Sequence, residues 1–314
     1  MSGRAHDHDH GHRDPAGHGH FAALNGFGPA FAVGVTLNLA FVVVEVFYGM
    51  SAHSIALLAD AGHNLGDVFG LVMAWVAATL ATRPPSRRYT YGLRRSTIVA
   101  ALGNAVLLLL SVGAIAVESV RRLLDPVPVA GTMVMVVAGV GIVLNGLTAL
   151  LFASGRRRDL NLRAAFLHMF YDALVSAGVV IAAGVIILTG WTRLDALVSL
   201  AIAGVILVGS WSLLRDSLGL SLDAVPEGIE VDAVRQFLQQ QPGVRSIHDL
   251  HIWPMSTTEI ALTCHCLMPA GHPGDEMLSA LAYELRERFG IGHATIQVEV
   301  DDRVACALEP DHLV

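Results

Sequence analysis

Six apolar segments of membrane-spanning length occupy roughly the first two thirds of the chain. A helix needs about 20 predominantly apolar residues to cross a bilayer, and each segment reaches that length before a polar break ends it. We therefore predict a bundle of six transmembrane helices. They are expected at residues 29–50, 55–81, 97–120, 131–153, 164–189 and 194–214.

From about residue 220 the pattern changes to that of a soluble domain. Two stretches carry apolar residues at helical spacing and three favour strands, in the order helix, strand, strand, helix, strand. These stretches are residues 229–241, 244–253, 258–268, 273–289 and 295–300. The order predicts a small α+β (αββαβ) domain. The expected divisions are a tail at 1–28, the membrane domain at 29–215, the C-terminal domain at 216–302 and a tail at 303–314.

Arginines are concentrated in two of the breaks between the apolar segments. Residues 82–95 contain five arginines and residues 155–163 contain four, whereas the other breaks hold few. Positively charged loops stay on the cytoplasmic side of a membrane. We therefore expect the loops after the second and fourth spans, both chain termini and the C-terminal domain to be cytoplasmic, in a bacterial inner (plasma) membrane.

The composition is that of a membrane protein, and it argues against nucleic-acid binding and against a disulfide framework. Hydrophobic residues make up 54% of the chain and charged residues 15%, with a mean hydropathy of +0.57; soluble domains carry about 25% charged residues. The net charge of −7 does not indicate nucleic-acid binding. Three cysteines, Cys264, Cys266 and Cys306, are too few for a disulfide framework.

Two histidine–aspartate pairs lie inside the apolar segments. His63 and Asp67 are four residues apart on the second span, and His168 and Asp172 repeat the spacing on the fifth. Side chains four apart leave the same helix face, and ionisable groups within a membrane usually mark an ion path. Two imidazoles and two carboxylates complete a four-coordinate shell for Zn²⁺. We predict that these four residues form a metal transport site.

The donor set also restricts the ion and suggests how its movement is driven. Imidazole with carboxylate suits Zn²⁺, and also Cd²⁺ or Co²⁺, whereas Mg²⁺ and Ca²⁺ prefer oxygen alone. Metal binding needs neutral imidazole and ionised carboxylate, so protons compete with the metal. Asp60, one turn before His63, is either a supporting or entry residue of this site or a helix-capping aspartate.

The first twenty residues contain six histidines among Asp, Gly and Pro, and we expect them to be disordered. Two interpretations are open, which are metal capture and a solubilising tail. The histidines are His6, His8, His10, His12, His18 and His20.

The motifs together resemble the cation diffusion facilitator family, of the zinc-transporting type with a His/Asp pair on spans two and five. The similarity runs from about Thr36 to Asp301. Its motifs are Ser54–His63 leading into Asp67, Tyr89–Gly92, His168 with Asp172, Leu222–Glu227 and His248–Trp253. The resemblance implies a homodimer, a metallochaperone-like cytoplasmic domain and export of metal from the cytoplasm in exchange for protons. It also places His63, Asp67, His168 and Asp172 at the family's transport-site positions.

The C-terminal domain offers a second group of candidate ligands, for a regulatory cytoplasmic metal. These are His248, His251, His265 and Glu299; the resemblance matches His248, His265 and Glu299 to positions that bind metal in some family members. Cys264 and Cys266 point away from His265 on a regular strand, so we expect them to be core residues. Asp223 is a candidate partner for an arginine after span two, such as Arg94.

Three functional hypotheses follow. The first is a Zn²⁺/proton antiporter, with Zn²⁺ as substrate and possible regulatory ligand and no organic cofactor. The second is a transporter of Mg²⁺ or an organic cation that uses the His/Asp pairs as a proton relay. The third is a membrane metalloenzyme, which would need an open coordination position and a base beside it. Because four protein ligands leave neither, we do not expect an enzyme. The sequence does not rank Zn²⁺ against Cd²⁺ or Co²⁺.

Overall fold

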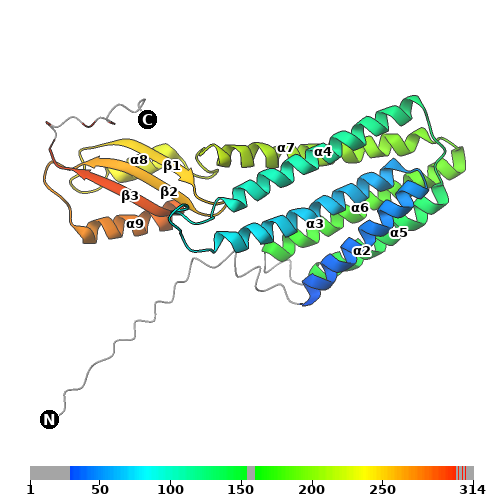
Figure 1. The fold of residues 1–314 in the computed structure, drawn as a ribbon, viewed down its shortest axis with the longest axis horizontal. Coiled ribbons are helices and arrows are strands. Elements are labelled where there is room, and N and C mark those ends of the chain that lie inside the picture. Colours follow the sequence, from blue (N-terminus) through cyan, green and yellow to red (C-terminus); the bar gives the residue numbers. More distant parts are fainter. Residues whose placement is uncertain (1–28, 154–159, 302, 304–305, 307, 309–314) are drawn as a thin grey trace, which may run out of the picture.

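The protein is an elongated molecule in which a helical bundle is joined end to end with a small sheet domain (Figure 1). The computed structural model describes residues 29–153 and 160–301, with residues 303, 306 and 308. For residues 29–35, 37–38, 151–153 and 160–168 it describes the backbone alone. The histidine-rich stretch 1–28 lies outside the described residues.

Six helices form the bundle, as the sequence predicts. Within the described residues, five contain spans that are long and apolar enough to cross a membrane, and the sixth contributes a shorter apolar helix, Leu39–Ser51. The helices are α2 (Pro29–Ser51), α3 (Ile55–Ala81), α4 (Ser96–Leu124), α5 (Gly131–Ala153), α6 (Leu160–Thr189) and α7 (Arg193–Ser221).

Helix α3 is central to the bundle, since it packs against α2, α4, α6 and α7. We call the end of the bundle next to the sheet domain proximal and the opposite end distal (Figure 1). In the distal half, small and β-branched residues let the helices approach closely. The buried cluster there includes Ala56, Val134, Val179, Ala183 and Ile202.

The distal start of α3 is held by a residue of another helix. Ser54 is its N-cap and accepts a hydrogen bond from the backbone N–H of Leu57. Asp195, at the start of α7, accepts the hydroxyl of Ser54 at 2.5 Å and the backbone N–H of Ile55 at 2.7 Å. A carboxylate at a helix N-terminus accepts hydrogen bonds from backbone N–H groups that have no partner within the helix. The contact with Asp195 of α7 therefore fixes where α3 begins.

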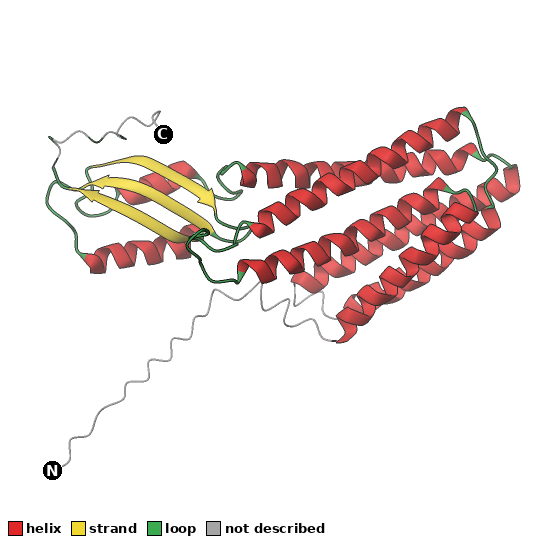
Figure 2. Cartoon of the chain, in the orientation of Figure 1, coloured by secondary structure: helices red, strands yellow, loops and turns green. Residues whose placement is uncertain are grey.

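The sheet domain has the predicted αββαβ order. Its elements are α8 (Val231–Gln239), β1 (Ser246–Pro254), β2 (Ile260–Leu267), α9 (Asp275–Phe289) and β3 (Ile291–Glu299). The strand order is β1-β2-β3, with β1 antiparallel and β3 parallel to β2 (Figure 2). Helices α8 and α9 share one core with the sheet, in which Phe237 and Phe289 have ring centroids 5.5 Å apart.

The two faces of the sheet have different chemistry. Cys264 and Cys266 are buried in the core shared with the helices, which confirms the prediction that they are core residues. A bulge in β1 shifts the register between His248 and His251, so that His248 pairs with His265 and His251 with Thr263. Paired residues of neighbouring strands share a face. The bulge therefore brings both β1 histidines to the face opposite the cysteines.

Candidate functional site

Side chains from α3 and α6 converge near the middle of the bundle. Nε2 of His63 lies 3.6 Å from Oδ2 of Asp67 and 3.6 Å from Oδ1 of Asp172. Asp172 is 1% exposed, whereas His63 and Asp67 are partly accessible. At 1.5 Å per residue, His63 lies about 12 Å along α3 from Ile55. The site is thus well inside the apolar layer.

Three of the four residues predicted for this site face one another. His168, the fourth, belongs to α6, but its side chain lies outside the described residues. Its backbone position is one helical turn from Asp172 on the same face. The geometry of the described part is that expected for two helices sharing one dication.

A second group of polar side chains lies beside His63 and comes from α2, α3 and α6. Asp60 is fully buried and accepts a hydrogen bond from the hydroxyl of Ser176 on α6 at 3.0 Å. Asn64 donates its side-chain amide to Glu45 on α2 at 3.2 Å. Asp60 is therefore not the cap of α3, because Ser54 has that position. It links α3 with α6 one turn from His63.

A cavity of about 310 Å³ opens from the site toward the proximal half of the bundle. His63 and Asp67 line it from α3, Asn104 from α4, and Ser210 and Leu213 from α7. Asn104 and Leu213 each lie eight residues from the proximal end of their helix, about 12 Å along its axis. Beyond His63, the buried cluster and the Asp60–Ser176 hydrogen bond join α3 to its neighbours. A separate cavity of about 630 Å³ in the distal half is lined by α2 and α5 and does not include the site residues.

This arrangement suits reversible binding of a divalent cation. Two carboxylates neutralise the charge of a dication, which lowers the cost of holding it in a medium of low dielectric. The neutral imidazole supplies a nitrogen that a borderline cation prefers over oxygen alone. Because the same atoms bind protons, metal and protons exclude each other here.

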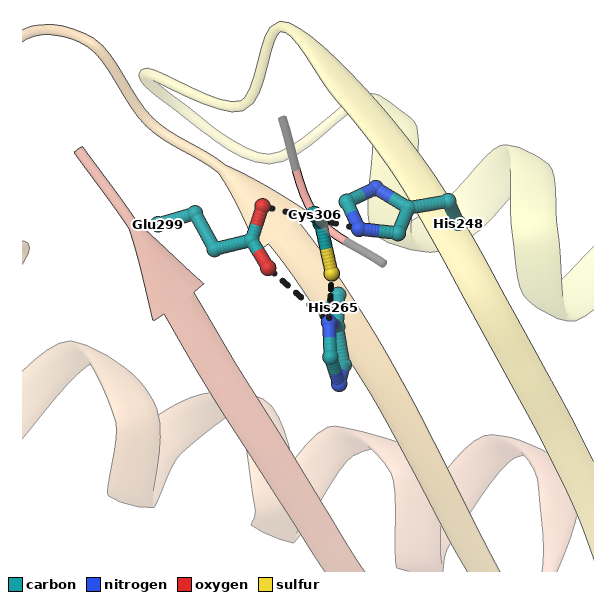
Figure 3. Close-up of side chains that lie close together, drawn as sticks. All are labelled: His248, His265, Glu299 and Cys306. Atoms are coloured by element: carbon teal, nitrogen blue, oxygen red, sulfur yellow. Dashed lines mark hydrogen bonds and ion pairs between the residues drawn. The ribbon is translucent and has the colours of Figure 1, made fainter. Parts of the chain in front are cut away.

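A second cluster lies on the free face of the sheet (Figure 3). His248, His265, Glu299 and Cys306 each direct one donor atom into a space where these atoms lie within 4.8 Å of one another. Nδ1 of His265 is 2.9 Å from Oε1 of Glu299 and 3.5 Å from Sγ of Cys306. Nε2 of His248 is 3.5 Å from Oε2 of Glu299.

The ionisation of this cluster follows from its neighbours. Burial opposes the charge of Glu299, but hydrogen bonds from Cys306 and His265 and the charge of His248 outweigh it, so the pKa of Glu299 is lowered. The pKa of Cys306 is raised: a backbone hydrogen bond from Leu308 opposes the rise, but burial and the carboxylates of Glu299 and Asp249 exceed it. Without a metal the acidic side chains thus keep the thiol protonated.

The structure changes the membership of this predicted group. His251 is not among the four clustered side chains, because its Nε2 instead pairs with Asp249 at 2.8 Å. The sequence analysis missed Cys306 as a member of this cluster because it lies beyond the last strand, in the predicted tail at 303–314. The signal available was its position only seven residues after Glu299.

Contacts between the bundle and the sheet domain confirm that Asp223 pairs with an arginine after span two, but the arginine is Arg95 and not Arg94. Asp223 forms an ion pair with Arg95, and Arg94 instead pairs with Glu259 in the β1–β2 connection. Arg95 is the N-cap of α4 and Arg94 lies in the turn before it, and the two neighbouring side chains reach different elements. Thr257 also donates its backbone N–H to the hydroxyl of Thr97 at 3.1 Å.

Comparison with known proteins gives two family matches. Residues 31–220 match the cation efflux transmembrane domain, and residues 226–301 match the cytoplasmic domain of cation efflux proteins. Among solved structures, the metal-bound C-terminal domain of the CzcD transporter from Cupriavidus metallidurans is 38% identical over 23% of this chain and 99% of that chain, with a TM-score of 0.22.

Several curated relatives are similar over most of their length. Zinc transporter ZitB of Escherichia coli is 37% identical over 86% of each chain. The metal cation efflux system protein CzcD of Cupriavidus metallidurans is 34% identical over 95% of this chain and 90% of its own. The cadmium, cobalt and zinc/H⁺-K⁺ antiporter of Bacillus subtilis is 33% identical over 91% of this chain and 92% of its own.

Proposed function

The chain belongs to the cation efflux family, and we propose that it is a Zn²⁺ exporter that exchanges cytoplasmic zinc for protons. It is an integral membrane metal transporter whose relatives are named for zinc, cadmium and cobalt. Cd²⁺ and Co²⁺ are accordingly the further expected substrates. These names do not favour the alternative substrates, Mg²⁺ or an organic cation.

The observation that carries the proposal is the position of His63. Its Nε2 is 3.6 Å from a carboxylate oxygen of Asp67 on its own helix and of Asp172 on another. A four-coordinate zinc ion has ligand bonds of about 2.0–2.2 Å to nitrogen and oxygen, which separates neighbouring ligand atoms by about 3.3–3.6 Å. The three described residues thus match a shared ion, with His168 as the proposed fourth ligand.

The side from which zinc loads is inferred from access to this site. The cavity beside His63 and Asp67 extends toward the sheet domain, whereas the cavity in the distal half is lined by α2 and α5 and does not include the site residues. The arginine-rich loops support a cytoplasmic location for that end and for both termini. We therefore propose that zinc enters from the cytoplasm in this conformation, and that repacking of α3 and α6 against α4 and α7 opens the other side.

Proton exchange supplies the driving force in this proposal. Zinc binds when the imidazole is neutral and the carboxylates are ionised. On the acidic side, protons return to the same atoms and weaken the ligands, so the metal leaves. Histidine is suited to this step because its pKa lies near physiological pH. Zinc affinity should therefore rise as the cytoplasmic pH increases from about 6 to 8.

Two further features belong to the same proposal. The match of residues 226–301 to the family's cytoplasmic domain, which is described as a dimer domain, supports a homodimer in the inner membrane of a bacterium. His248, His265 and Glu299 are proposed to bind a second, cytoplasmic Zn²⁺ that senses the metal level. The membrane spans provide transport, and no catalytic role is proposed.

Zinc uptake into everted membrane vesicles with an acidic interior tests the transport site. Asp172→Asn keeps the size of the side chain but removes a charge that a buried dication needs, so zinc uptake should fall at least about 100-fold. Asp67→Asn and His63→Ala should lose uptake similarly. Tyr171→Phe is the matched control, because Tyr171 is next to Asp172 but 60% exposed on the outside of the bundle. Near-normal uptake by Asp172→Asn would refute the site.

A further inference from the structure

A further cavity of about 670 Å³ lies where the bundle meets the sheet domain. It is lined by the proximal ends of α3 and α4, by residues 88–95 of the loop that joins them, and by Trp253 of the sheet domain. Figure 1 shows this loop, residues 82–95, beside the sheet domain. The cavity shares no lining residue with the cavity of the transport site. It is also separate from the four clustered side chains on the sheet.

The wall of this cavity within the bundle is apolar and faces outward. Met73, Val76 and Leu80 line it from α3, and Val99 lines it from α4. Residues spaced by three and four form one stripe along a helix. Val76 is 40% and Val99 64% exposed, so the stripe is on the outside of the bundle. Met73 lies eight residues before the end of α3, so the stripe extends about 12 Å along the helix into the apolar layer.

The other end of the cavity is positively charged. Residues 82–95 contain five arginines and no aspartate or glutamate, and three of these arginines line the cavity. Two of the three already have acidic partners, because Arg94 pairs with Glu259 and Arg95 with Asp223. Arg88 is exposed and forms no ion pair with a described residue. Since a guanidinium stays charged at any physiological pH, this end of the cavity attracts an anion.

Aromatic rings surround Arg88. Its guanidinium carbon lies 5.7 Å from the ring centroid of Tyr89, a distance typical of a cation–π contact. Tyr89 and Tyr91 line the cavity and are about half exposed, at 50% and 49%, and Trp253 lines it from the sheet domain. Tyrosine and tryptophan are enriched at the level of the lipid headgroups. The charged end of the cavity is therefore expected at the membrane surface, with the apolar stripe in the hydrocarbon.

The loop that carries Arg88 is folded by its own hydrogen bonds. The backbone N–H groups of Ser86 and Gly92 both donate to the carbonyl of Tyr89 at 2.9 Å. Gly92 has a φ of 72°, and a Cβ there would lie 2.8 Å from the carbonyl oxygen of Arg83. A preformed site loses less conformational entropy when a ligand binds. The turn thus holds Arg88 and both tyrosines in place before binding.

We propose that this cavity binds an anionic phospholipid of the cytoplasmic leaflet, with the phosphate at Arg88 and an acyl chain along Met73, Val76 and Val99. A guanidinium binds phosphate through two parallel hydrogen bonds, and basic pockets at the cytoplasmic ends of transmembrane helices suit anionic headgroups. A free phosphate ion would leave the apolar stripe unused. Because Trp253 belongs to the sheet domain, the bound lipid contacts both domains. This inference goes beyond metal transport and uses none of the metal-binding residues.

Native mass spectrometry of the full-length protein in detergent tests the site. Phosphatidylglycerol should bind at one lipid per chain and more tightly than phosphatidylcholine, whose choline is repelled by the arginines. Arg88→Gln should weaken phosphatidylglycerol binding at least about 10-fold, because it removes the phosphate contact. Arg87→Gln is the matched control, since Arg87 is the adjacent exposed arginine but does not line the cavity. It should bind phosphatidylglycerol nearly as the wild type does.

The stability of the protein gives a second measurement. A ligand that binds only the folded state raises the unfolding temperature, so phosphatidylglycerol should raise it for the wild type and for Arg87→Gln, but not for Arg88→Gln. Equal lipid binding by the two variants would overturn the inference, because it would mean that the loop attracts lipid only through its total charge. Displacement of the lipid by excess glycerol phosphate would also overturn it, in favour of a site for soluble phosphate.

The subunit count in the same mass spectra tests another occupant. If a second copy of the chain filled the cavity, the dimer would bind no lipid there and Arg88→Gln would dissociate it. Binding of one phosphatidylglycerol per chain within an intact dimer is the expected result. Zinc uptake into vesicles is measured separately on the same variants. A protein without zinc uptake that still binds phosphatidylglycerol through Arg88 would refute the transport proposal and support the lipid site.

Discussion

At the scale of single residues, Asp195 has the largest structural role that sequence reasoning did not identify. Its carboxylate accepts hydrogen bonds from the Ser54 hydroxyl and from the backbone N–H of Ile55 at the start of α3. An aspartate in an apolar helix gives no sign of which distant helix it contacts. Its partners are about 140 residues away, and only the packing of α3 against α7 brings them together.

The cap formed by Asp195 gives a stability prediction. Asp195→Ala leaves buried donors at the start of α3 without an acceptor, which costs about 1–3 kcal/mol. We expect a lower thermal unfolding temperature in detergent. Asp216→Ala is the control, because Asp216 is an exposed aspartate on the same helix. Equal unfolding temperatures for the two variants would contradict the role of Asp195.

Residue spacing alone predicts only part of the environment of Asp60. The helical repeat correctly places Asp60 one turn from His63, but it left open whether Asp60 supports the metal site or caps the helix. The structure excludes the cap, since Asp60 is buried against Ser176 on α6. Spacing gives the face of a helix, whereas the partner across that face depends on how the helices pack.

At the scale of elements, the sequence predicts every helix and strand of the two domains, and the differences are at their ends. β3 begins at Ile291 rather than residue 295, because Gly292 and His293 at its start are exposed and hide the alternating pattern. α7 continues to Ser221, past the expected end at 214. Arg215 and Asp216 end the apolar segment there but not the helix, which extends beyond the membrane-spanning part.

The ion pairs between the bundle and the sheet domain give an element-scale prediction. Asp223 pairs with Arg95 and Glu259 with Arg94. Exposed ion pairs contribute only about 0–1 kcal/mol each, so their loss should affect the placement of the sheet domain more than stability. Asp223→Arg opposes Arg95 directly, and we expect it to reduce zinc uptake into vesicles several-fold.

Charge exchange distinguishes this pair from the one predicted from sequence. Adding Arg95→Asp to Asp223→Arg should restore zinc uptake, because it recreates the pair with reversed charges. Adding Arg94→Asp should not, since that arginine contacts Glu259 instead. Rescue by Arg94→Asp, but not by Arg95→Asp, would show that the domains are arranged differently in the membrane.

At the scale of the whole molecule, the sequence predicts orientation but not conformation. Arginine distribution distinguishes the cytoplasmic side, yet nothing in the residue pattern shows on which side the metal site opens. The structure has a cavity beside the site residues that extends into the proximal half, whereas the cavity in the distal half is lined by α2 and α5 and does not include those residues. The difference depends on how tightly α3 and α6 contact α4 and α7 at each level, which local sequence does not specify.

Cysteine accessibility tests this conformation. We expect Ser210→Cys, in a protein without its natural cysteines, to react with a membrane-impermeant thiol reagent from the cytoplasmic face, because Ser210 lines the cavity. Ser199→Cys is the matched control, since Ser199 lies on the same helix in the distal half but does not line the cavity. At 1.5 Å per residue it lies about 16 Å farther from the cytoplasm, and we expect it to stay unreactive.

Zinc makes the accessibility experiment specific to the metal site. A bound ion at His63, Asp67 and Asp172 fills the distal end of the cavity, so it should slow modification of Ser210→Cys several-fold. Mg²⁺ should not protect, because imidazole is a poor ligand for it. Protection should also disappear when Asp172→Asn is added. Labelling of Ser210→Cys only from the opposite face would mean that the resting transporter opens outward, against the direction of loading inferred from the cavity.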